Sequence, residues 1–117
     1  MYSDLDDIMC AAISLLHRLG ATANYSGVAQ TTFAATLCVQ RQGRLLRITK
    51  DLYPDVAAHF NTNWKAVERN IRSVRTVVWS KNPGLLGQVA QRHLSDIPTN
   101  AQFLAILSAY LLQSSQF

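Results

Sequence analysis

Apolar residues recur three and four positions apart along almost the whole chain, which is the spacing of amphipathic helices. The strict alternation that marks strands is nearly absent. Capping residues, glycines and prolines divide the pattern into segments, and no internal repeat or long linker separates them. We therefore expect one compact all-α domain over 1–117, with helices at about 4–19, 28–42, 44–52, 54–60, 63–80, 85–94 and 101–113.

The first two of these helices have clear signals for their ends or their packing. Ser3 is placed to cap the first helix, and Gly20 is placed to end it. We expect the second helix to pack Phe33, Leu37 and Cys38 into the core. The apolar stripe of the first helix consists of Leu5, Ile8, Met9, Ala12, Leu15, Leu16 and Leu19.

The stretch 53–80 combines a short helix, a tight polar turn and a long helix. Pro54 suits the first turn of the short helix, because that position has no use for an amide hydrogen. Asn61, Thr62 and Asn63 favour turns and helix caps, so we expect the turn near 61–63 and the long helix at about 63–80. This is the form of a helix-turn-helix, whose second helix enters the DNA major groove. An ordinary helical hairpin in an all-α core is the alternative.

The long helix has two chemically different faces. At about 100° per residue, four apolar side chains fall within roughly 60° of one another and predict the buried side: Val67, Ile71, Val74 and Val78. The opposite side carries Lys65, Arg69, Arg72 and Thr76, with Glu68 at its edge and Arg75 nearer the core. Arginine binds guanine, glutamate accepts from cytosine and threonine contacts the thymine methyl, so this face has the makeup of a DNA-reading surface. A solvated face with a Glu68–Arg72 pair is the alternative.

The N-terminal end of this helix, its leading end, carries a capping residue and a tryptophan. We expect Thr62 or Asn63 to cap it, which leaves its first backbone amides close to where a phosphate would lie. Trp64 and Trp79 bracket the helix. We expect both to pack in the core, and contact with a sugar–phosphate backbone is the alternative for Trp64.

Charge is distributed unevenly along the chain. The net charge is +4, but residues 41–81 alone carry +6 and the remainder −2. Such asymmetry is typical of a surface that binds a polyanion, and a basic face without a partner is the alternative. Arg44, Arg47 and Lys50, with Arg41 before them, are placed to hold DNA phosphates without reading bases.

The remaining chemistry argues against other classes of protein. Cys10 and Cys38 lie in helical apolar patterns and indicate buried free thiols in a reducing cytoplasm. The histidines at 17, 59 and 93 are scattered singly, so we expect no metal site, no cofactor and no catalytic site. No apolar run is long enough to span a bilayer and no secretory leader is evident, which predicts a cytoplasmic protein without a membrane partner.

Several strings resemble the C-terminal effector domain of the stage-zero sporulation master regulator of endospore-forming Firmicutes. The resemblance is strong over about 45–112. It rests on Ile48 to Ala57, Phe60-Asn61-Thr62, Val67 to Arg72, Trp79-Ser80, and Pro98-Thr99-Asn100 with Phe103.

This resemblance implies a six-helix transcription-factor domain that binds double-stranded promoter DNA. It implies base reading or backbone contact by Glu68, Arg69 and Arg72, to which we assign base reading. From the residue pattern described above we expect flanking or backbone contacts from Thr62, Asn63, Lys65, Arg75, Thr76, Arg44, Arg47 and Lys50. It further implies contact with the sigma subunit of RNA polymerase through about 81–92, and pairs of copies, as a homodimer, on tandem sites.

The chain departs from the family at two places. At Asn63 to Ala66 we expect smaller residues and a basic residue directly before Val67, where this chain has Ala66. The second place is the stretch around Pro83-Gly84. The family's receiver domain is not among these residues. A second hypothesis is therefore a protein-interaction module, such as a decoy or antagonist of a full-length regulator, that keeps the fold without specific DNA binding.

Overall fold

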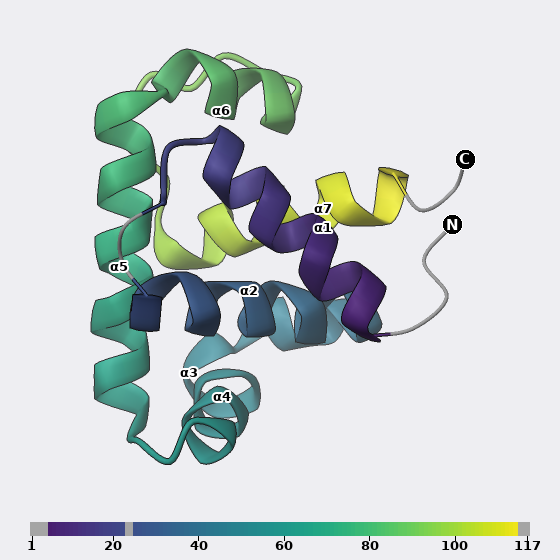
Figure 1. Cartoon of the computed structure of the whole chain (residues 1–117), viewed down its shortest axis with the longest axis vertical. Coiled ribbons are helices and arrows are strands. Elements are labelled where there is room, and N and C mark those ends of the chain that lie inside the picture. The colour runs from purple at the N-terminus through teal and green to yellow at the C-terminus, as the bar shows by residue number, and fades with distance from the viewer. Residues whose placement is uncertain (1–4, 23–24, 115–117) are drawn as a thin grey trace.

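Helices account for the regular secondary structure within residues 5–22 and 25–114, which are the residues that this computed structural model describes. The all-α class is confirmed, and six of the helices contain seven residues or more (Figure 1). In chain order the elements are α1 (Leu5–Arg18), α2 (Tyr25–Gln40), the 3₁₀ segment η1 (Gln42–Leu46), α3 (Ile48–Asp51), α4 (Tyr53–His59), α5 (Trp64–Lys81), α6 (Pro83–Ala90) and α7 (Asn100–Ser114). The expected cap at Ser3 lies outside the described residues.

Helix α2 is the centre of the domain and packs against α1, α5 and α7. In Figure 1 it runs across the middle of the molecule, with α5 upright along one side. Small side chains let its neighbours approach from several directions. The buried small residues include Thr31, Thr32, Ala34, Ala35, Thr36 and Cys38, and Gln30 is buried beside them. The Thr36 hydroxyl donates to the Thr32 carbonyl at 2.8 Å, so one of these polar groups is satisfied within the helix.

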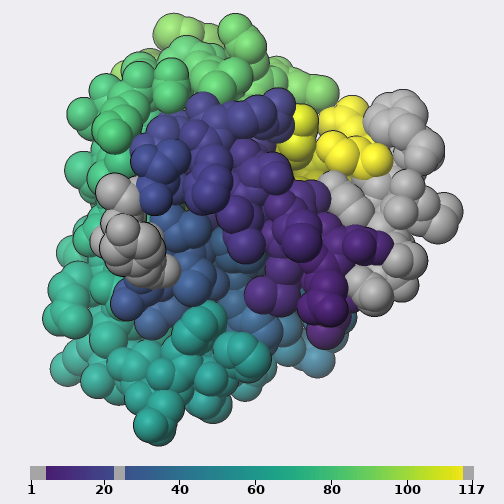
Figure 2. All heavy atoms as spheres, viewed as in Figure 1, coloured from purple at the N-terminus to yellow at the C-terminus, as the bar shows by residue number. Residues whose placement is uncertain are grey.

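Phe33, Leu37 and Cys38 of α2 all pack in or against the core, as expected, but to different depths. Cys38 is fully buried, but Phe33 and Leu37 are only half-buried, and the small residues lie deepest. A single apolar stripe is expected of a helix on the surface, whereas α2 is covered on more than one side. Figure 2 shows α1 lying over α2 on one face of the molecule, with α5 along the edge.

Three of the expected helices differ from those observed. Helix α2 begins at Tyr25 rather than 28, so Gly27 lies within its first turn. The segment 44–52 is not one helix: η1 and α3 replace it. Helix α6 begins at Pro83, which occupies the first turn as proline can, and it ends at Ala90 because Gln91 takes a left-handed φ of 60°.

The two cysteines have different environments. Burial raises the pKa of the Cys38 thiol to about 12, so this thiol is protonated at neutral pH. Cys10 is exposed, which contradicts the expectation of two buried thiols, because it falls on the outer side of α1. Within the described ranges, no helix has the length and apolar character needed to cross a membrane.

Gly20 ends α1 and brings it against the far end of α5. Its φ is +103°, and the amide of Ala21 donates to the Leu16 carbonyl at 2.9 Å, which is the bonding of a left-handed helix terminus. Close by, the Asn82 side chain donates to the Leu19 carbonyl at 3.1 Å. The expected stop at Gly20 is thus confirmed, and it joins segments far apart in the sequence.

Gly20→Ala should lower the free energy of unfolding by about 1–3 kcal/mol, the usual cost of holding a side chain in a strained backbone conformation. The added Cβ would also lie 3.1 Å from the Cβ of Lys81 and 3.3 Å from the Asn82 amide nitrogen. Urea unfolding followed by circular dichroism measures the change. Gly84→Ala is the matched control, because it enters open space within α6 and should leave stability equal or slightly higher. Equal stabilities for the two variants would contradict the role given to Gly20.

Candidate nucleic-acid interface

A short structured turn joins α4 to α5. The amide of Thr62 donates to the Ala57 carbonyl at 2.9 Å, and that of Asn61 to the Ala58 carbonyl at 3.3 Å. These are the two bonds of a Schellman terminus, which needs a left-handed residue at its turn. Asn61 supplies that residue with a φ of 55°, and asparagine is among the few side chains that tolerate it. The turn expected near 61–63 is therefore confirmed, and its geometry is set by hydrogen bonds.

Asn63 begins α5 as its cap. Its backbone is extended, and its Oδ1 accepts from the amide of Ala66 at 2.9 Å. Of the two residues expected to cap the helix, Asn63 has this role, and Thr62 is exposed in the turn before it. Helix geometry leaves the first amides of α5 without partners inside the helix, so the leading end of α5 carries partial positive charge.

One face of α5 is completely covered. Val67, Ile71, Val74 and Val78 are each at most 1% exposed, and α5 packs against α2, α4, α6 and α7. Trp79 is half-buried against the same core, as expected. The apolar side predicted from the helical period is confirmed in full.

The opposite face of α5 is open. Lys65, Arg69, Arg72 and Thr76 are exposed there, as the helical period predicts, while Glu68 and Arg75 are half-buried at its margin. Arg72 Nη2 lies 3.6 Å from Glu68 Oε1, a loose pair between side chains that remain 52% and 39% exposed. Within the described part of the chain, no carboxylate pairs with Arg69. The face therefore presents guanidinium groups that are free or weakly held.

A buried asparagine fixes this open face relative to the rest of the domain. Asn100, the first residue of α7, donates from Nδ2 to the Tyr53 hydroxyl at 3.1 Å and to the Glu68 carbonyl at 3.2 Å. It therefore connects the first helix of the motif, the second helix and α7. Burial raises the pKa of Tyr53, and the hydrogen bond from Asn100 opposes this increase only partly. The hydroxyl consequently remains neutral and able to accept.

A hollow of about 430 Å³ lies beside the open face and shows residues that the sequence did not single out. Arg72 and Arg75 of α5 line it together with Thr49, Thr99 and the start of α7. Thr99 and Gln102 cap α7 reciprocally, with N···O distances of 2.9 and 3.1 Å. The Thr99-x-x-Gln102 spacing is a recognisable helix start, but only the fold shows that it adjoins α5.

The expected phosphate contacts before the motif have unequal freedom. Arg44 Nη1 lies 2.6 Å from both the Asp51 carbonyl and Asp55 Oδ2, and its side chain is only 14% exposed. Arg47 is exposed and pairs with Asp51 at 3.3 Å, and Lys50 is exposed. Arg44 therefore joins η1 to α3 and α4, which leaves Arg41, Arg47 and Lys50 as the accessible charges.

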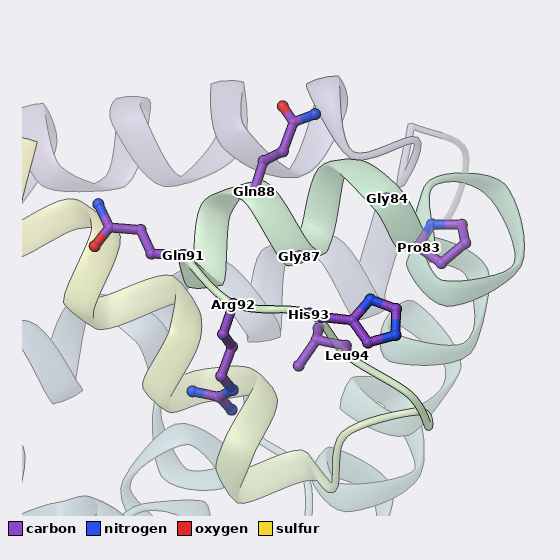
Figure 3. A pocket seen from close by; sticks show the side chains of 8 residues that line it. All are labelled: Pro83, Gly84, Gly87, Gln88, Gln91, Arg92, His93 and Leu94. Carbon is purple, nitrogen blue, oxygen red and sulfur yellow. The ribbon is translucent and has the colours of Figure 1, made fainter.

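The segment 81–92, expected to contact a polymerase subunit, comprises the end of α5, α6 and the start of the following loop. A hollow of about 530 Å³ adjoins it, lined by Pro83, Gly84, Gly87, Gln88, Gln91, Arg92, His93 and Leu94. Figure 3 shows the Gln88 side chain on one side of α6 and the His93 ring on the other.

No group of three or more potential metal ligands occurs among the residues described.

Asn63→Ala should lower the free energy of unfolding by about 1 kcal/mol, because the amide of Ala66 loses its acceptor. Denaturant unfolding of the purified domain gives this value directly. Asn61→Gly, two residues earlier, is the matched control and should be neutral or slightly stabilising, because glycine adopts the left-handed conformation without strain. If both variants unfold like the wild type, the cap contributes nothing to the stability of α5.

Comparison with known families adds one finding. The family model described as sporulation initiation factor Spo0A C terminal matches residues 12–111. The match includes the α4–turn–α5 unit, the loop before α7 and most of α7. The family is one of DNA-binding regulatory domains and not of enzymes.

Proposed function

The chain belongs to the family of sporulation initiation factor Spo0A C-terminal domains, DNA-binding effector domains of a sporulation regulator, and from this premise we propose that it regulates transcription by binding specific double-stranded DNA. The observation that carries this proposal is α5, with one face fully buried and the other rich in accessible arginine. A helix with its side chains is about 10–12 Å wide, which matches the width of the major groove. In this arrangement α4 crosses the DNA backbone and α5 enters the groove.

We assign base reading to three residues of the open face. Arg69 and Arg72 are suited to guanine, because a guanidinium can donate two hydrogen bonds to O6 and N7. Glu68 is suited to the amino group of cytosine. The Glu68–Arg72 distance of 3.6 Å supports this assignment, because so loose a pair is exchanged for base contacts at little cost.

The backbone contacts surround these base readers. The capped leading end of α5 offers its free amides to a phosphate, close to Thr62 and Asn63. Lys65, Arg75, Thr76, Arg47 and Lys50 supply further contacts around it. Arg44 supports this surface by holding η1 against α4 through its pair with Asp55. The charge of +6 over 41–81 attracts the polyanion before specific contacts form.

Two further parts of the proposal follow from the family. We propose that 81–92 contacts the sigma subunit of RNA polymerase, and that two copies occupy tandem sites. The exposed side chains of Lys81, Gln88 and Arg92 offer polar groups for a protein contact, and α6 lies at the opposite end of α5 from the turn (Figure 1). A polymerase could therefore approach α6 while the leading end of α5 remains on DNA. This activity would take place in the cytoplasm.

Arg69→Ala and Arg72→Ala should each weaken binding to the preferred duplex by about 1–3 kcal/mol and relax the base preference. The duplex is selected from a random pool with the wild-type domain, and binding is measured by fluorescence anisotropy. Arg92→Ala is the matched control, because it removes the same charge from a surface that we place away from DNA. It should change the affinity little.

The dependence on salt separates the proposal from its alternative. Several phosphate contacts make the affinity fall steeply as the salt concentration rises. Equal binding to scrambled duplexes would contradict sequence specificity. Absence of any DNA binding, together with capture of a protein partner that Arg69→Ala does not affect, would instead support the protein-interaction module.

A further inference from the structure

Trp64 is an exposed aromatic residue at the leading end of α5. It is the first residue of the helix, and 39% of its surface is accessible. The expectation that it packs in the core is therefore wrong for a large part of the ring. The ammonium of Lys65 lies 5.8 Å from the centroid of the ring, so a positive charge accompanies the apolar surface.

The position of Trp64 explains its exposure. The buried stripe begins at Val67, almost one helical turn later, so the core does not extend as far as Trp64. Residues four apart lie side by side on a helix, which places Trp64 next to Glu68, at the margin of the open face. Its accessible surface is thus continuous with the surface to which we assign base reading.

We infer that Trp64 is an apolar DNA contact that adds a preference for thymine at one end of the recognised sequence. This inference rests on the proposed function. The N-terminal residues of a recognition helix are those that reach base edges, and apolar side chains read the methyl group of thymine. A large apolar ring gains free energy when it leaves water, and the packed sugars and bases of DNA would cover the part that the protein leaves open.

Lys65 makes DNA a better partner than an apolar protein surface for this end of α5. Its ammonium beside the ring would have to be desolvated in an apolar protein interface, whereas a phosphate would pair with it. The free amides of the first turn of α5 also favour an anion. The observed combination of aromatic ring, ammonium and helix start therefore suits a methylated base edge next to a phosphate.

An apolar contact has a signature that distinguishes it from a charged one. Loss of a phosphate contact reduces the dependence of affinity on salt, because fewer counterions are released. Loss of an apolar contact lowers the affinity equally at every salt concentration. Trp64→Ala should therefore weaken binding about tenfold with an unchanged salt slope, whereas Lys65→Ala should reduce that slope by about one contact.

The experiment uses the selected duplex and the same duplex with uracil replacing thymine, which removes only the methyl groups. The wild type should bind the uracil duplex more weakly, and Trp64→Ala should bind both equally. Leu5→Ala is the control for loss of an exposed apolar side chain, because Leu5 is 44% exposed on α1, and it should bind like the wild type. Thermal unfolding of each variant verifies that the domain is folded.

A second measurement leaves Trp64 intact. The chain has two tryptophans, so in Trp79→Phe the fluorescence comes from Trp64 alone, and the duplex should protect it from quenching by acrylamide. If the wild type binds DNA but Trp64→Ala binds as tightly, or Trp64 remains unprotected, this inference is wrong and the proposed function stands. Protection by self-association without DNA would also overturn it. If the wild type binds no duplex, the proposed function itself fails.

Discussion

The structure depends on the burial of one face of α5. Val67, Ile71, Val74 and Val78 are removed from water together, and each such side chain contributes about 1.5–3 kcal/mol. Because these residues follow the helical period, covering them turns the opposite side of the helix outward. The small residues of α2 allow that helix to lie in the centre with α5 against it. Arg69 and Arg72 are therefore exposed because the opposite face of α5 fills the core.

Several polar interactions fix the orientation of α5 relative to the rest of the domain. Asn61 and Asn63 set the turn and the start of α5, and Asn100 joins its middle to α4 and α7. Each interaction is worth only about 1 kcal/mol, but together they leave α5 little freedom to rotate. A surface that reads bases benefits from such order, since fewer conformations are lost on binding. Side chains at the edge, such as Trp64, thus start from a defined position.

The sequence predicted α5 well, because a clean 3.6-residue period, a turn of asparagines and a change from apolar to basic faces all agree there. It failed where local signals conflict with packing. The helix expected from 28 begins at Tyr25, with Gly27 in its first turn, and the helix expected from 85 begins at Pro83. The outward side of Cys10 and the environment of Trp64 depend on where the core ends. The pairing of Arg44 with Asp55 depends on how η1 folds back, and charge patterns along the chain do not contain that information.

The hydrogen bond between Asn82 and Leu19 has a consequence for the order in which the fold is assembled. It joins residues 63 positions apart, whereas the turn between α4 and α5 spans only four residues. Closing the longer loop costs roughly 2.5 kcal/mol more chain entropy. Bringing together α4 and α5, the helical pair that we assign to DNA binding, therefore costs the chain less entropy. Docking of α1 onto the end of α5 costs more chain entropy than forming that pair.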